Sequence, residues 1–283
     1  MVRQIDVMHL GRDRVIAAHE VRGLIVDPGP ESSLHTLLDA LGGEEPRGLL
    51  LTHIHLDHAG ASGALVRQFP DLPVYVHERG APHLVDPSKL LASAAKLYGD
   101  DMQRLWGEVV PIPERNIRVL RGGETLEGFR VEYTPGHASH HVSYLLEETG
   151  DAFVGDVGGV LIPPSQYVVA PTPPPDIDIE AWLRSLEIVE GWAPSTLRLT
   201  HFGCTHDVAY QLSQVRERLH RWGELARTND EDTFVREIEA EILEANETDT
   251  DTSIRFFQAV PAAQSYLGLK RYWAKRSETA AAG

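Results

Sequence analysis

The chain of 283 residues contains a single cysteine, Cys204, and comparatively few basic residues. One cysteine excludes an intrachain disulfide, which is typical of proteins from a reducing compartment. There are 26 Lys and Arg against 42 Asp and Glu, so the formal net charge is −16. Nucleic-acid binding needs several basic side chains to neutralise phosphates. No basic run is present, and we therefore expect no nucleic-acid partner.

Long apolar segments are also missing. No stretch approaches the roughly 20 apolar residues that a membrane-spanning helix needs. The first residues, MVRQIDVMHLGRDR, lack the apolar centre of a signal peptide. We therefore expect a cytoplasmic protein with no membrane contact. The 42% of hydrophobic residues is nevertheless ample for a large buried core.

Short apolar runs alternate with turns through the first two thirds of the chain. These runs predict strands at 5–8, 14–17, 23–26, 48–52, 74–76, 117–119, 124–126, 130–133, 142–146, 151–154 and 197–200. Helical spacing predicts helices at 31–41, 59–69, 79–106, 179–191, 208–227, 232–245 and 250–275. Asp176 or Asp178 would cap the helix that begins at 179. The pattern predicts an α/β domain over 1–205 and a helical extension over 206–283.

Histidine is the most unevenly distributed residue, with 14 copies. Histidines follow predicted strand ends at three places, after Thr52, after Tyr133 and after Thr200. Catalytic residues are often carried by loops at strand ends, because the strands hold such loops on a rigid scaffold. The three places are therefore candidate parts of one site.

The densest cluster is the segment His53-Ile54-His55-Leu56-Asp57-His58. On a strand, residues 53, 55 and 57 would share a face, whereas on a helix 53, 57 and 58 would converge. In a loop that opens a helix, the set could split between two neighbouring ions. Imidazole and carboxylate ligands suit zinc, iron or manganese. The alternatives are a chance cluster in a surface loop and a single structural metal site.

The cluster resembles the HxHxDH signature of the metallo-β-lactamase superfamily. Four other segments are similar to the remaining motifs of that family and follow its order: Asp27, Thr134-Pro135-Gly136-His137, Gly155-Asp156 and Leu199-Thr200-His201. The resemblance implies a four-layer αββα fold, here with a C-terminal helical extension. It points to the glyoxalase II-like or lactonase-like branch of the superfamily.

The resemblance also implies two divalent metal ions, zinc first and iron or manganese as alternatives. The implied ligands are His53, His55 and His137 for the first ion, Asp57, His58 and His201 for the second, and Asp156 between both. Asp27 would orient motif residues by hydrogen bonding. A hydroxide between the ions would be the nucleophile, and Asp57 and Asp156 would be the catalytic side chains, with Asp57 steering or relaying a proton.

The expected substrate is a small ester, thioester or lactone. The helical extension, together with the predicted helices around Leu84 to Trp106, would cap the metal cleft as a lid. The extension could instead form the surface of a homodimer. Tyr167, Phe202 and Tyr266 are candidate substrate contacts, although aromatic residues at helical spacing more often belong to a core. No basic cluster that would hold the carboxylates of glutathione is found in the extension, so thioester specificity stays open.

The histidines outside the motifs are expected to have structural roles. We expect one of His140 and His141 to face solvent and neither to bind metal, and we expect His9 and His77 to be ordinary structural residues.

One alternative function is an iron-dependent oxidoreductase similar to persulfide dioxygenases, which would use one metal. The other is a non-enzymatic metal-binding protein. The complete set of ligands for two metals favours the hydrolase.

Overall fold

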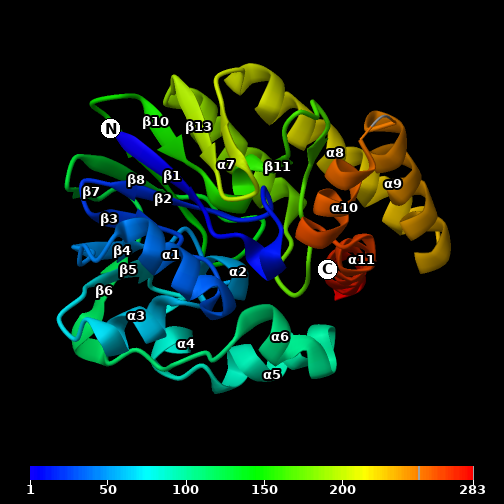
Figure 1. The fold of residues 1–283 in the computed structure, drawn as a ribbon. Helices are drawn as coiled ribbons and strands as arrows, with labels where there is room; N and C mark the ends of the chain where they lie inside the picture. The colour runs from blue at the N-terminus through cyan, green and yellow to red at the C-terminus, as the bar shows by residue number, and fades with distance from the viewer. Residues whose placement is uncertain (248, 283) are drawn as a thin grey trace.

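The computed structural model describes residues 1–247 and 249–282, and its centre is a pair of six-stranded sheets (Figure 1). The first sheet has the order β1 (Val2–Asp6), β2 (Ala17–Val21), β3 (Leu24–Val26), β4 (Gly48–Leu50), β5 (Val74–His77) and β6 (Ile117–Leu120). The second has the order β14 (Gly203–Thr205), β13 (Thr196–Leu199), β10 (Asp151–Phe153), β9 (Val142–Leu146), β8 (Phe129–Tyr133) and β7 (Thr125–Leu126). Strands β11 (Val160–Leu161) and β12 (Val168–Val169) form a separate pair.

Helices cover the outer face of each sheet (Figure 1). On the first sheet these are α1 (Leu34–Leu41), α3 (Ser62–Gln68) and α4 (Ala81–Val85). On the second they are α7 (Ile179–Gly191) and α8 (Val208–Thr228). The other helices are α2 (Leu56–Ala59), α5 (Ser88–Tyr98), α6 (Met102–Trp106), α9 (Glu231–Ala245), α10 (Thr250–Ala259) and α11 (Ala262–Ala282).

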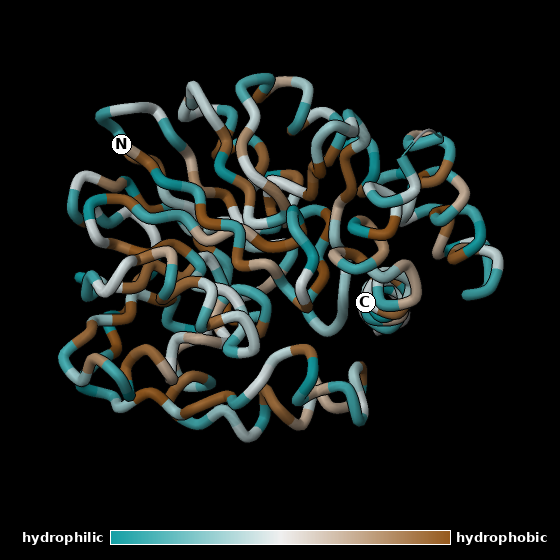
Figure 2. Tube along the Cα trace, viewed as in Figure 1, coloured by the Kyte–Doolittle hydropathy of each residue, from teal (hydrophilic) through white to brown (hydrophobic). Residues whose placement is uncertain are grey.

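Hydrophobic residues are frequent along the strands of both sheets (Figure 2), and their buried side chains form the core between the layers. Between the two sheets, Leu24 and Leu50 of the first belong to one buried cluster with Phe129, Tyr144 and Phe153 of the second. Separate clusters lie under the outer helices of each sheet. Burial on both faces explains why β3, β4 and β9 are nearly continuous apolar runs. The arrangement confirms the expected four-layer αββα fold.

The helical extension shares its hydrophobic core with the second sheet. Leu212 and Val215 of α8 belong to the same buried cluster as Leu199 of β13 and Val160 of β11. The predicted boundary after residue 205 falls between β14 and α8, and the core continues across it. Within 1–247 and 249–282, no helix is long and apolar enough to cross a membrane.

Three predicted elements differ from the structure. The expected strand at 14–17 is a turn leading into β2, because the Asp6 carboxylate accepts the backbone N–H of Arg14 and holds a loop there. The expected helix at 79–106 is broken into α4, α5 and α6, with Pro87 before α5 and Gly99, which has a φ of +50°, after it. The expected helix at 250–275 is two helices, because Pro261 restricts Val260 to an extended conformation.

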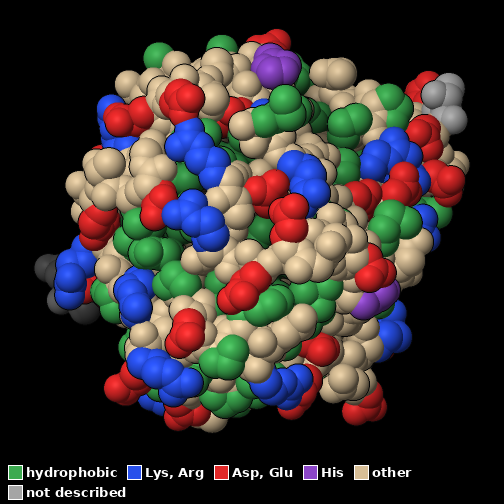
Figure 3. Space-filling view, turned by 60° about the vertical axis from the view of Figure 1, so that its left-hand side comes forward, with side chains coloured by type: hydrophobic (Ala, Val, Ile, Leu, Met, Phe, Trp, Pro, Cys, Tyr) green, Lys and Arg blue, Asp and Glu red, His purple; other side chains and the backbone are tan. Residues whose placement is uncertain are grey.

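Charged side chains of both signs are mixed over the surface shown in Figure 3. Lys and Arg alternate with Asp and Glu on this face, and neither sign forms a broad patch. Nucleic-acid binding typically uses a continuous basic stripe, which this face does not carry.

Candidate metal centre

Loops at the ends of five strands meet at one edge of the two sheets. Asp27 follows β3, and the segment 52–55 follows β4. Residues 134–137 follow β8, the 3-10 turn Gly155–Gly158 follows β10, and residues 200–201 follow β13. Strands β3 and β4 are parallel neighbours, as are β10 and β13, so the carboxyl end of each pair lies at one edge. The three histidine-bearing segments that the sequence singles out therefore converge.

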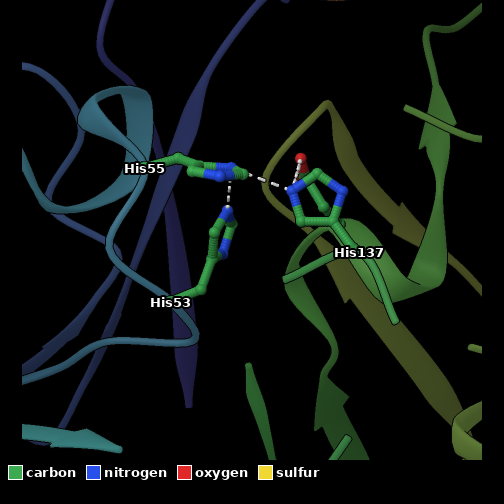
Figure 4. A group of neighbouring side chains, drawn as sticks. His53, His55 and His137 are labelled. Atoms are coloured by element: carbon green, nitrogen blue, oxygen red, sulfur yellow. Dashed lines mark hydrogen bonds and ion pairs between the residues drawn. The ribbon is translucent and has the colours of Figure 1, made fainter. Parts of the chain in front are cut away.

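The first group of ligand atoms comes from His53, His55, His137 and Asp156, and lies within 4.8 Å. His53 Nε2 and His137 Nε2 are each 2.9 Å from His55 Nδ1, as Figure 4 shows. His137 Nε2 is also 3.3 Å from Asp156 Oδ2. Three imidazoles and a carboxylate therefore point to one spot, which is the donor set of a metal ion.

A second group comprises Asp57, His58 and His201, again within 4.8 Å. His201 Nε2 lies 3.2 Å from Asp57 Oδ2, and His58 Nε2 lies 3.2 Å from Asp156 Oδ1. Asp156 thus turns Oδ1 towards this group and Oδ2 towards the first. The geometry matches a carboxylate placed between two ions.

Hydrogen bonds set the orientation of four of the five histidine rings in these groups. His58 Nδ1 donates to Asp27 Oδ2 at 2.8 Å, His137 Nδ1 to the Pro171 carbonyl at 2.9 Å, and His201 Nδ1 to the Val15 carbonyl at 2.8 Å. These oxygens only accept, so each Nδ1 carries a proton, and Nε2 is the ring atom left to bind a metal ion. A metal ligand held in this way has a fixed tautomer and ring orientation.

His53 is oriented by a chain of two hydrogen bonds. Thr52 Oγ1 donates its only proton to Asp27 Oδ2 at 2.8 Å. The same oxygen is 3.0 Å from His53 Nδ1 and must therefore accept a proton from it. His53 Nε2 is then left with a lone pair directed into the first group.

Asp27 connects three of the loops, as its expected orienting role requires. Its carboxylate accepts from the backbone N–H and hydroxyl of Thr52, from the hydroxyl of Thr200 at 2.9 Å, and from His58. The side chain is fully buried. A buried carboxylate with several donors holds those donors in one arrangement.

Among the ligands, burial and the neighbouring charges shift the pKa values in opposite directions. Burial raises the pKa of the Asp156 carboxyl, but His58, His137 and His201 outweigh it and hold this pKa well below its usual range. Burial lowers the pKa of His58, but Asp156, Asp57 and Asp27 outweigh it and raise this pKa well above its usual value. Burial lowers the pKa of His55 to about 4. The imidazoles of the first group are thus neutral, whereas the carboxylates around His58 favour a positive charge at its position, which a bound cation would supply.

These observations fit a pair of divalent cations. His58 Nε2 is buried and, among the described residues, has no hydrogen-bond partner of good geometry, although it faces two carboxylates. His55 Nδ1 faces two ring nitrogens that carry lone pairs and has at most one proton to share. A cation in each group would satisfy the atoms that hydrogen bonds leave unsatisfied.

The expectation that His140 or His141 faces solvent is wrong, because both are buried. The segment after His137 turns inward instead of entering a strand, and β9 begins only at Val142. The His141 ring lies 5.1 Å from that of His53 at 26° between the planes, and its Nδ1 is 2.9 Å from Thr134 Oγ1. Neither histidine belongs to the two ligand groups.

The aromatic residues expected to contact substrate lie away from the ligand groups. The Tyr167 hydroxyl donates to Glu241 on α9, and the Tyr266 hydroxyl donates to the carbonyl of Asn229. Phe202 is buried in the core beneath α8. None of the three lines the cavities at the ligand groups. All three pack with the hydrophobic core of the second sheet and the extension instead.

Two cavities border the ligand groups, with volumes of about 720 and 740 Å³ that include space open to solvent. Asp57 lines both, while His55 and Asp156 line the first and His201 the second. Further lining comes from α5, from the proline segment 171–175 and α6, and from the junction of α10 with α11, so the extension forms part of the cleft.

His9, expected to be ordinary, lines the second cavity, where its ring stacks on Trp106 at 5.5 Å. Nothing in the local sequence indicates this position, because a 3-10 turn at His9–Gly11 and a distant helix create it. The α5 residues on the cleft could have been found from their helical spacing.

Comparisons with known proteins agree with this geometry. The family model of the metallo-beta-lactamase superfamily matches residues 15–201. The metallo-beta-lactamase fold-containing protein ST1585 of Sulfurisphaera tokodaii is 30% identical over 189 residues, which cover 64% of this chain and 68% of the relative. A hydroxyacylglutathione hydrolase of Gloeothece citriformis is 33% identical over 137 residues, 47% of this chain and 43% of that protein. The match thus spans less than half of that hydrolase.

Solved structures share the fold. The crystal structure of the archaeal protein ST1585 from Sulfolobus tokodaii has a TM-score of 0.70 at 21% identity and covers 95% of this chain and 98% of its own. TTHA1623, solved in a di-iron-bound form, has a TM-score of 0.50 at 28% identity and covers 75% of this chain and 90% of its own. The matched residues 15–201 contain both ligand groups, and the chain belongs to the metallo-β-lactamase superfamily.

Proposed function

We propose that this protein is a hydrolase that binds two divalent metal ions and cleaves a small ester, thioester or lactone. The observation that carries the proposal is the pair of ligand groups that share Asp156 and border two cavities. Relatives described as a probable metallo-hydrolase and as hydroxyacylglutathione hydrolases support hydrolysis as the reaction class.

Each residue of the centre has a role in this proposal. His53, His55 and His137 would hold one ion, Asp57, His58 and His201 the other, with Asp156 serving both. Two bound divalent cations supply Lewis acidity and lower the pKa of water. Asp27 keeps His58 and the Thr52 loop in position through the hydrogen bonds described above.

Asp57 is the ligand best suited to move a proton. Its side chain is 21% exposed, whereas those of His58 and His201 are almost fully buried, and it borders both cavities. Asp57 Oδ2 faces His201 Nε2, so we assign proton transfer between water and the leaving group to Oδ1. The walls formed by α5 and α11 limit the access of bulk water to this carboxylate.

Metal analysis combined with a substrate panel tests the proposal. Protein purified without added metal, and protein loaded with zinc, iron or manganese, is analysed for metal and assayed on esters, thioesters and lactones. We expect about two ions per chain and turnover that is lost on chelation. The di-iron form of TTHA1623 makes iron a candidate beside zinc.

Two results would contradict the proposal. One iron per chain with oxygen consumption on a persulfide would indicate the oxidoreductase. Two bound ions without turnover on any member of the panel would indicate a metal-binding protein without this activity.

A further inference from the structure

The two cavities meet at one polar bridge above the candidate metal centre. Tyr98 at the end of α5 and Gln264 on α11 line both cavities, and the Tyr98 hydroxyl donates to Gln264 Oε1 at 3.4 Å. Asp57 lies at the floor of both. A substrate whose reacting carbonyl is at Asp57 can therefore extend one substituent into each cavity.

The first cavity has a largely apolar wall. The α5 residues that line it are Leu90, Ser93, Ala94, Leu97 and Tyr98, with the spacing i, i+3, i+4, i+7 and i+8 of a single helix face. Pro173–Pro175 and Val260 line the opposite side. Such a wall favours a hydrocarbon group, because burial of apolar surface is the main gain available there.

Away from the metal centre itself, neither cavity offers a positive side chain to a substrate. Among the described residues that line them, none is lysine or arginine, and the charged ones are Asp57, Asp101 and Asp156. Lys89 and Lys96 of α5 are exposed and lie outside the cleft face. A carboxylate or phosphate remote from the reacting carbonyl would lose water here without gaining a partner, at a large cost in free energy.

The second cavity instead carries neutral polar atoms. Its lining includes the neutral polar side chains of Tyr98, Gln258 and Gln264. A hydroxyl and side-chain amides can exchange hydrogen bonds with an uncharged carbonyl or hydroxyl group. The cavity therefore favours an uncharged polar group.

From these walls, and resting on the proposed hydrolase activity, we infer that the substrate carries no negative charge on either side of the scissile carbonyl. Its acyl part is a hydrocarbon group along α5, and its leaving group is uncharged. Thioesters of glutathione, which has carboxylates, and of coenzyme A, which has phosphates, fall outside this class.

Two matched esters test the inference by turnover. 4-Nitrophenyl hexanoate and mono-4-nitrophenyl adipate share the leaving group and the chain length, and differ in a terminal carboxylate. We expect kcat/KM to be at least about tenfold higher for the hexanoate, the equivalent of one unpaired polar group. Equal values, or a preference for the adipate, would overturn the inference and leave the hydrolase proposal standing.

Binding provides a readout that does not depend on turnover. 2-Octanone and 7-oxooctanoate differ in a terminal carboxylate, and neither is hydrolysed. Each is titrated calorimetrically into metal-loaded protein and into protein from which the metal has been removed by chelation. Removal of the metal excludes binding of the carboxylate directly to an ion. In the chelated protein the ketone should bind at least about tenfold more tightly. Equal binding, or binding of neither, would overturn the inference even if every ester were inert and the hydrolase proposal had failed.

A positive charge introduced on the cleft face should reduce the preference for the uncharged ester. Ser93→Lys places an ammonium group on the wall of the first cavity, and Ala95→Lys places one on the exposed side of the same helix. Ser93→Lys should raise kcat/KM for the adipate ester relative to the hexanoate by about threefold to tenfold, as expected of a partly exposed ion pair. Ala95→Lys should leave the ratio unchanged. An equal effect of both variants would contradict the assignment of this wall.

Discussion

The metal centre and the cleft above it are built in opposite ways. In the centre, four of the five imidazole ligands are buried, and hydrogen bonds to loops at strand ends hold the same four rings. In the cleft, apolar faces of α5 and of the α10–α11 junction come together, with one long hydrogen bond between Tyr98 and Gln264. Chemistry needs fixed lone pairs, whereas substrate selection depends on the shape and charge of the walls. Changes in the first region should therefore abolish metal binding and turnover, and changes in the second should alter preference.

The largest effect is expected from Asp156, which faces both ligand groups. Asp156→Asn keeps the size of the side chain but removes the charge, so metal content should fall below two ions per chain and turnover by more than about a hundredfold. Asp151→Asn is the matched control, because Asp151 is a buried carboxylate on β10 that pairs with Arg198. Elemental analysis and steady-state kinetics measure both. Full activity of Asp156→Asn with two ions would refute the role of Asp156.

A smaller effect is expected from the side chain that orients the ligands. Asp27→Asn cannot accept from His58, Thr52 and Thr200 together, because one of its two polar atoms becomes a donor. Metal affinity, measured by competition with a chelator, should fall by about tenfold to a hundredfold. Thr200→Val removes one of these bonds and should cost less. If both variants bind metal as the wild type does, the network does not position the ligands.

The attachment of the extension should matter for stability more than for chemistry. The buried Arg255 of α10 donates from Nε to the backbone oxygen of Asp13 at 3.0 Å. Arg255→Met should lower the free energy of unfolding by about 1–2 kcal/mol, while the half-exposed carboxylate of Asp13 contributes little. Urea denaturation measures this change. Arg236→Met, on the exposed side of α9, is the control, and equal stabilities of the two variants would argue against this contact.

The smallest effect is expected at the bridge between the cleft walls. Tyr98→Phe removes a hydroxyl at 3.4 Å from Gln264 and leaves every metal ligand in place. The KM for a small ester should rise by about twofold to fivefold with metal content unchanged, because a weak hydrogen bond contributes little. Tyr210→Phe, whose hydroxyl bonds to the carbonyl of Gln166 on the exposed surface, should change neither. Loss of metal from Tyr98→Phe would show that the cleft wall also supports the metal centre, and would contradict the separation of the two regions.

Local patterns predicted much of the fold. The continuous apolar runs at β4 and β9 indicate strands buried on both faces, and the Asp178 carboxylate caps α7 as a sequence reading suggests. The errors fall where a single residue overrides a pattern. Pro261 divides the helix expected at 250–275, and the hydrogen bond from Arg14 N to the Asp6 carboxylate replaces the beginning of a strand.

The histidines separate what spacing can and cannot predict. His53, His55 and His58 lie within six residues, so their spacing alone indicated a metal site. His141 stacks on His53 only because the loop after β8 turns inward, and adjacency to a motif did not reveal this. Tyr167 and Tyr266 carry hydroxyls that could bind a substrate, yet each hydroxyl donates a hydrogen bond to a residue outside the cleft.

By itself, the sequence determined the fold family, the ligand residues expected of the metal centre and the reaction class we propose, because these depend on short motifs at strand ends. Only the tertiary structure decided what covers the centre. Tyr98 and Gln264 are 166 positions apart and meet only when α11 folds back over α5. The charge and polarity of a cleft become defined when such distant faces pack together, and no local pattern carries that information.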